Sequence, residues 1–142
     1  MKDFVRRLQP VAVAMLLLAC TQTAFASPSI VGTWNAQFSV NGVACSMQTV
    51  YQPNAAYSEL LHCGSLMTHQ SGTYVLHGNL LVRSVEDWAP KQQWVVGSCV
   101  GCGYYENTAK PPGGSYNLSF PNSNTMTMKD VNLGGTITMH RQ

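Results

Sequence analysis

Charged side chains are scarce in this sequence: Asp, Glu, Lys and Arg make up 10% of its 142 residues, against about 25% in an ordinary soluble protein. Three of the eight Lys and Arg residues (Lys2, Arg6 and Arg7) and one of the six acids (Asp3) precede residue 27. The five cations and five anions that remain cancel. No basic stripe is left that could neutralise a row of phosphates, which excludes nucleic acid as a partner.

Recognisable catalytic patterns are also missing. The five acids that follow residue 26 form no acid/base motif, and there is neither a Gly-x-Ser-x-Gly elbow nor a phosphate-binding glycine loop. Cys99 and Cys102 have the spacing of thiol oxidoreductases, but those enzymes place the motif at a helix start, and here it lies among glycines and tyrosines. We therefore predict that the protein is not an enzyme and uses no cofactor.

The N-terminus has the three parts of a secretory signal peptide. A basic start precedes an apolar run at 11–18, and Ala24-Phe25-Ala26 is a small-x-small cleavage site. The run is too short for a permanent span, which needs about 20 apolar residues. We predict that residues 1–26 are a signal peptide, and that residues 27–142 are a single domain exported to the periplasm or secreted.

A second kind of processing competes with simple cleavage. Leu17-Leu18-Ala19-Cys20 resembles the lipobox of bacterial lipoproteins, in which the cysteine becomes the lipidated first residue. In that case Cys20 would carry the anchor of an outer-membrane lipoprotein. Membrane attachment is expected only under this alternative.

The composition of residues 27–142 favours strands and turns, because Ser, Thr, Asn, Gln and Gly outnumber Lys and Glu. Trp34, Ala36, Phe38 and Val40 alternate with polar residues, which predicts a strand with one wet face. Further strands are predicted at 43–51, 57–67, 72–77, 80–88, 92–96, 116–120, 125–129 and 135–141. This all-β pattern indicates an antiparallel up-and-down β-barrel of about eight strands, with a β-sandwich as the alternative. Closure removes the sheet edges, which favours the barrel.

One hairpin has a register that can be derived. Pro and Asn in 52–56 supply a turn between two predicted strands. Pairing Tyr51 with Tyr57 then brings Cys45 opposite Cys63, six residues further along each strand. We predict a cross-strand disulfide between these two cysteines.

The segment 97–114 is the one long stretch without periodicity, and it holds Cys99, Cys102, Tyr104 and Tyr105. In an oxidising compartment the two cysteines would close a small disulfide ring; a zinc site made by the four cysteines after residue 26 is the alternative that export disfavours. A loop of this length commonly has a role, such as covering the mouth of a cavity. A surface excursion without a ligand is the other interpretation.

Gly32-Thr33-Trp34 on the first predicted strand resembles the Gly-x-Trp signature of lipocalins and related calycin barrels. The chain looks most like the small lipocalin-like domains of exported bacterial envelope proteins. The resemblance implies that Trp34 plugs the closed end of the barrel. It also implies that Arg141, near the end of the last strand, packs across this tryptophan.

A barrel of about eight strands encloses space for packed side chains or for one small ligand. Aromatic and methionine side chains suit an apolar ligand. The candidate ligand-binding residues are Trp88, Trp94, Tyr104, Tyr105, Met126, Met128 and Met139. The leading functional prediction is a lipocalin-like carrier of a small apolar molecule in the periplasm or at the outer membrane. Filling of the core is the alternative role of each residue.

Two other functions are predicted as alternatives. An envelope interaction or inhibitor module would bind a partner protein through the segment 97–114. A metal-binding periplasmic protein follows from the predicted hairpin between 57–67 and 72–77, which brings His62 nearly opposite His77. Two imidazoles on one side of a strand pair are two of the three or four ligands that zinc takes.

Overall fold

Ten β-strands make up most of residues 28–142, the part of the chain that the computed structural model describes. They are β1 (Gly32–Val40), β2 (Val43–Tyr51), β3 (Ala56–Cys63), β4 (Leu66–His77), β5 (Leu80–Ala89), β6 (Gln92–Val96), β7 (Gly103–Asn107), β8 (Gly114–Asn122), β9 (Thr125–Asp130) and β10 (Thr136–Arg141). Within these residues no helix is long and apolar enough to cross a membrane. The predicted signal peptide and Cys20 lie outside the described residues.

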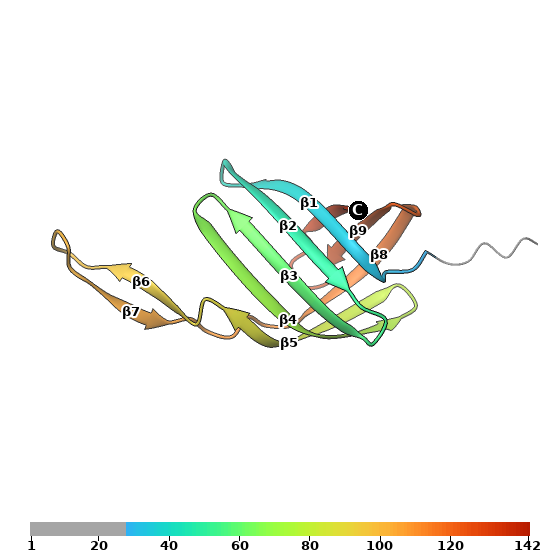
Figure 1. Cartoon of the computed structure of the whole chain (residues 1–142). Helices are drawn as coiled ribbons and strands as arrows, with labels where there is room; N and C mark the ends of the chain where they lie inside the picture. Colours follow the sequence, from blue (N-terminus) through green and yellow to red (C-terminus); the bar gives the residue numbers. More distant parts are fainter. Residues whose placement is uncertain (1–27) are drawn as a thin grey trace, which may run out of the picture.

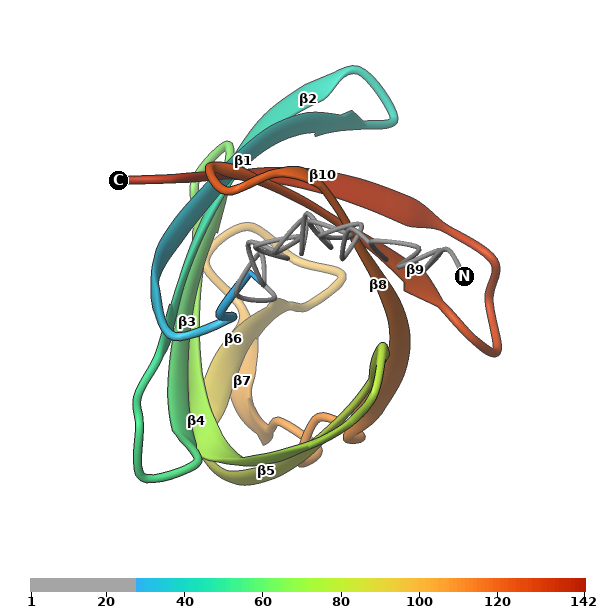
Figure 2. The same ribbon diagram turned by 90° about the vertical axis from the view of Figure 1, so that its right-hand side faces the viewer.

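Eight of the strands close into an antiparallel barrel in the order β1-β10-β9-β8-β5-β4-β3-β2, while β6 and β7 pair only with each other (Figures 1 and 2). The predicted all-β, up-and-down barrel is confirmed. The turns explain the connectivity: Asn41 and Gly42 both have positive φ between β1 and β2 (49° and 80°), the conformation that a two-residue hairpin of this kind requires.

The hairpin of β2 and β3 has the register that the sequence predicts. Tyr51 pairs with Tyr57, and Cys45 pairs with Cys63. The two cysteines form the predicted disulfide, as do Cys99 and Cys102.

The turn between β3 and β4 is tighter than the sequence suggests. Gly64 adopts a φ of +59° there, so β4 begins at Leu66 rather than at 72 and runs for 12 residues. His62 is consequently opposite Met67, and His77 lies ten positions further along β4, roughly 33 Å away at 3.3 Å per residue. The predicted juxtaposition of His62 and His77 is therefore wrong.

The segment 97–114 is also not a single irregular loop. Its residues 103–107 form β7, which pairs with β6 in a hairpin that projects away from the barrel (Figure 1). At the tip, Gly97 N donates to the carbonyl oxygen of Cys102 (2.8 Å). Glycines and prolines on either side of this five-residue strand hide its alternation in the sequence.

The two ends of the barrel differ. We call the end where β1 begins and β10 finishes the closed end, because Trp34 fills it: this residue has no exposed surface, and its Nε1 donates to the carbonyl oxygen of Ile30 (2.7 Å). The guanidinium carbon of Arg141 lies 4.5 Å from the centre of the Trp34 ring, and Arg141 Nη1 donates to the carbonyl oxygen of Val31 (3.0 Å). This is the contact that the lipocalin resemblance implies.

The opposite end, which we call the open end, carries the β6–β7 hairpin and the β1–β2, β3–β4 and β9–β10 turns. The barrel is held together least by the β1–β10 pair. Only Trp34↔Arg141 and Asn35↔His140 are in register there, whereas β1 and β2 pair along the whole length of β1. Toward the open end, β1 and β10 are not joined by further ladder pairs.

Candidate functional site

A charged network crosses the interior of the barrel. Glu59 on β3 and Arg83 on β5 are 8% and 7% exposed, and Arg83 Nη1 lies 2.6 Å from Glu59 Oε2. The Thr49 hydroxyl donates to the same oxygen (3.0 Å), and the Gln70 amide donates to Glu59 Oε1 (2.7 Å). Both carboxylate oxygens thus have partners, as a buried charge requires.

Three tyrosines surround the guanidinium of Arg83. Its carbon lies 4.9 Å from the ring centre of Tyr57 and 4.8 Å from that of Tyr116, and Nη2 donates to the Tyr116 hydroxyl (3.1 Å). Burial lowers the pKa of Arg83, but the neighbouring Tyr51 and Glu59 raise it by more, so the pKa of Arg83 lies above its usual range. Burial also raises the pKa of Tyr51 and of Tyr57, so these phenols stay protonated beside the cation.

No sequence motif marks Glu59 or Arg83, but their positions carry a signal. Glu59 follows the buried Tyr57 by two residues, and Arg83 follows the buried Leu81 by two. Since side chains two apart on a strand share a face, both charges occupy inward positions. Opposite charges on the inward faces of two strands indicate an interior ion pair.

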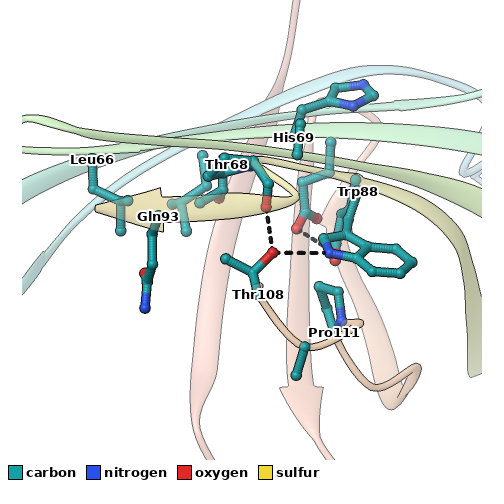
Figure 3. Close-up of a pocket in the computed structure, with 13 residues that line it drawn as sticks. Leu66, Thr68, His69, Trp88, Gln93, Thr108 and Pro111 are labelled. Carbon is teal, nitrogen blue, oxygen red and sulfur yellow. Dashed lines mark hydrogen bonds between the residues drawn. The ribbon is translucent and has the colours of Figure 1, made fainter. Parts of the chain in front are cut away.

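A cavity of about 370 Å³ opens at the hairpin end of the barrel (Figure 3). Its volume is within the usual range of small-molecule sites, about 300–1,000 Å³. Apolar side chains form most of its wall, and Glu59 and Gln70 reach it from the interior network. The remaining lining residues are Leu61, Leu66, Thr68, His69, Trp88, Ala89, Pro90, Gln93, Thr108, Ala109 and Pro111.

Trp88 is held in one orientation beside this cavity. Its Nε1 donates to the Thr108 hydroxyl oxygen (3.2 Å), and the Thr108 hydroxyl donates to the carbonyl oxygen of Pro90 (Figure 3). Lys91 Nζ lies 3.3 Å from the centre of the indole and 2.7 Å from Asp87 Oδ1. The hydrogen bond from Lys91 lowers the pKa of the Asp87 carboxyl. Because the Trp88 indole is already held in one orientation, ligand binding would cost less side-chain entropy.

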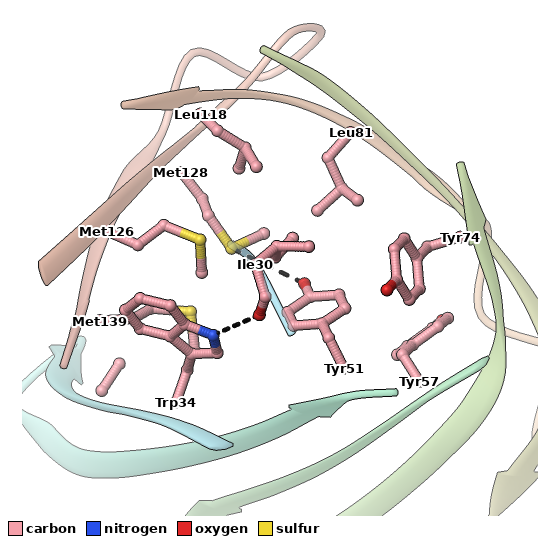
Figure 4. Packing of buried hydrophobic residues seen from close by; sticks show 11 residues of the cluster. Ile30, Trp34, Tyr51, Tyr57, Tyr74, Leu81, Leu118, Met126, Met128 and Met139 are labelled. Carbon is pink, nitrogen blue, oxygen red and sulfur yellow. Dashed lines mark hydrogen bonds between the residues drawn. The ribbon is translucent and has the colours of Figure 1, made fainter. Parts of the chain in front are cut away.

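The predicted ligand-binding residues lie in three places, and only Trp88 lines the cavity. Met126, Met128 and Met139 are buried in the core toward the closed end, together with Trp34 (Figure 4). Met126 and Met139 fill the barrel there, whereas Met128 also borders a second hollow, of about 350 Å³, beside Phe38 and Ile137. The interior is therefore packed around Trp34 and hollow toward the open end.

The other three predicted residues lie outside the barrel. Trp94, Tyr104 and Tyr105 are on the β6–β7 hairpin and are 51%, 58% and 67% exposed. Trp94 and Tyr105 pack edge to face, with ring centres 5.0 Å apart. The expectation that all seven residues surround one cavity is wrong, because pairing of β6 with β7 carries these aromatics away from the barrel.

The metal prediction has no cluster to support it. Among residues 28–142 no group of three or more His, Cys, Asp or Glu side chains is arranged to share a metal ion. The four cysteines in this range are paired as disulfides.

Comparison with known proteins gives no relative from which a role could be transferred. No protein-family model matches the chain, and no curated protein matches its sequence.

Proposed function

We propose that the protein is an exported, lipocalin-like carrier that binds one small, mainly apolar molecule in the cavity at the open end of the barrel. The observation that carries this proposal is the asymmetry of the interior. Trp34 and Arg141 occupy one end, while a cavity of about 370 Å³ occupies the other. Eight strands enclose enough space for one small ligand and little more.

The lining suggests what kind of molecule fits. Trp88, Pro90 and Pro111 offer flat apolar surface on one side, and Glu59 adds carboxylate oxygens at the floor. A carboxylate only accepts hydrogen bonds. The matching ligand is an apolar body with a hydroxyl or amine donor at one end.

Export to the periplasm or the cell exterior is part of the same proposal. The disulfides Cys45–Cys63 and Cys99–Cys102 suit an oxidising compartment. The signal-peptide features of residues 1–26 point the same way.

The first test is native mass spectrometry of the protein purified from its own envelope, before and after denaturation. An apolar molecule released on denaturation would support the proposal. The second test is titration with N-phenyl-1-naphthylamine, an uncharged fluorescent probe of apolar cavities. We expect the probe to bind and to raise the melting temperature. Absence of both the released mass and probe binding would overturn the carrier assignment.

A cavity-filling variant locates the binding. Leu61 lines the cavity, so Leu61→Trp should weaken probe binding at least tenfold. Val75→Trp is the matched control, because Val75 is on the outer surface of β4 and about half exposed; it should bind like the native protein. Near-ultraviolet circular dichroism checks that both variants fold. Equal binding by a folded Leu61→Trp variant would show that the probe does not occupy this cavity.

A further inference from the structure

The β6–β7 hairpin has an unusual surface. Residues 92–105 contain no charged side chain, and apolar groups point into solvent along their length. Val96 is 76% exposed, and Val100 at the tip is fully exposed. Exposed apolar patches of this kind mark sites of contact with a protein, a ligand or a membrane.

The order of side chains along the hairpin is layered. Trp94 pairs with Tyr105, and Val96 is two residues closer to the tip, about 7 Å further at 3.3 Å per residue. Glu106 follows Tyr105 on the barrel side. The sequence of layers from the tip is thus aliphatic, aromatic, then charged. Trp and Tyr prefer the headgroup level of a bilayer, with aliphatic groups beneath them.

Two backbone hydrogen bonds close the tip of the hairpin. Gly97 N donates to the carbonyl oxygen of Cys102, and Cys102 N donates to that of Cys99 (3.1 Å). The Cys99–Cys102 disulfide closes the same ring. Buried polar backbone is costly in lipid unless it is paired, so this ring lowers the cost of placing the tip below the headgroups. The outer edges of a two-stranded hairpin stay unpaired, which limits insertion to the interface.

The turns at the open end of the barrel also expose apolar side chains. Three of its turns are flanked by large apolar residues that are about half exposed or more: Val40 and Val43, Leu66 and Met67, and Val131 and Leu133. The antiparallel connectivity places all three turns at the end of the barrel from which the hairpin projects, and the β1–β2 and β3–β4 turns are visible there in Figure 1. The apolar surface therefore faces one direction, which suits a planar apolar partner.

We propose that the β6–β7 hairpin inserts its tip into the lipid–water interface of a bilayer, with the open end of the barrel facing the lipid. The partner that covers this apolar surface is the lipid bilayer. A protein interface of ordinary size buries about 800 Å² on each partner, and a narrow hairpin of two five-residue strands offers little flat area for that. Shallow insertion of aromatic and aliphatic side chains needs no matching surface. In this orientation the mouth of the cavity lies next to the bilayer.

The experiment uses the exported protein and vesicles of phosphatidylcholine brominated in the acyl chains. The bromines are placed on the acyl carbons nearest the headgroups, where they quench indoles at the headgroup boundary, so we expect lipid-dependent quenching of Trp94 fluorescence. Trp34 has no exposed surface, and Trp88, on β5 in the barrel wall, lies six residues further from the hairpin tip than Trp94. Trp94→Phe, which keeps an apolar ring, should therefore bind the vesicles and lose the quenching.

Val100→Glu places a charge at the tip and should raise the lipid concentration needed for half-maximal binding at least tenfold. Val75→Glu is the matched control, since it adds the same charge on β4 near the closed end, and it should bind as the native protein does. Failure of the native protein to bind would overturn the proposal and favour a protein partner for the hairpin. Binding that survives Val100→Glu, or quenching that survives Trp94→Phe, would overturn it as well, since another part of the protein would then hold the vesicle.

The insertion rests on the hairpin and the turns, so it does not require the carrier function. A protein that binds vesicles, releases no apolar molecule on denaturation and does not bind N-phenyl-1-naphthylamine would retain this inference and lose the carrier proposal. The reverse result would retain the carrier alone.

Discussion

Replacing Glu59 by Gln would test the interior network, because it removes the counter-ion of Arg83 and keeps the shape of the side chain. Arg83 would keep its positive charge, since a guanidinium is not deprotonated in proteins. The charge would then be left with phenol oxygens and one amide in place of a carboxylate 2.6 Å away.

The expected loss of stability follows from this geometry. Breaking a buried ion pair by removing one partner typically costs about 3–5 kcal/mol. We expect Glu59→Gln to be at the lower end, about 3 kcal/mol, because Tyr116 still accepts a hydrogen bond from Arg83. Removing both charges in Glu59→Gln/Arg83→Met should recover most of this loss, since apolar replacements of buried ion pairs are often neutral or stabilising.

Urea unfolding of the native protein and the two variants measures these differences. Asp87→Asn is the control, because Asp87 and Lys91 are also 2.7 Å apart but have side chains 68% and 54% exposed. Exposed pairs contribute little, so this variant should unfold at the native midpoint. Native stability of Glu59→Gln, or a double variant less stable than the single one, would contradict this role of the buried ion pair.

Truncation of the closed-end residue in Trp34→Ala should cost about 3–5 kcal/mol in urea unfolding; native stability of this variant would contradict its role in filling the barrel. Removing the Cys45–Cys63 disulfide with Cys45→Ser/Cys63→Ser should cost about 3 kcal/mol, the chain-entropy value for cysteines 18 residues apart, and an unchanged urea midpoint would contradict it. Burial raises the pKa of Tyr51 above its ordinary value of 10.0, so the unfolded chain releases this proton first. Stability should therefore be unaffected by Tyr51 below about pH 10 and fall above it by about 1.4 kcal/mol per pH unit; Tyr51→Phe should reduce this slope, and an equal slope in both proteins would contradict the assignment.

Local alternation made much of the barrel predictable. The period of two through Trp34 and Phe38 gives β1, and the turn after Tyr51 gives a register that places Cys45 opposite Cys63. Such features depend on residues close together in the sequence. The start of β4 was not predictable in this way, because the turn at Gly64 interrupts a run that alternates on both sides.

The candidate site was less predictable because it depends on contacts between distant strands. Arg83 meets Glu59 across 24 positions of sequence, and no local pattern specifies which strands bring them together. Trp88 was predictable as an aromatic near a cavity, but the same criterion also selected Trp94. Only the pairing of β6 with β7 separates the two, by carrying Trp94 out of the barrel.

The β1–β10 seam has a consequence for the order of folding. Arg141 donates to Val31 across 110 positions of sequence, and Gln142 N donates to the carbonyl oxygen of Thr33 (3.0 Å). Contacts at such separation form late, after the local hairpins have shortened the path between the chain ends. We expect the amide of His140, beside this seam, to exchange with solvent through smaller openings than the amides shared by β4 and β5. The ring of strands can close only when residues 140–142 have been synthesised, and until then the barrel strands form an open sheet with two free edges.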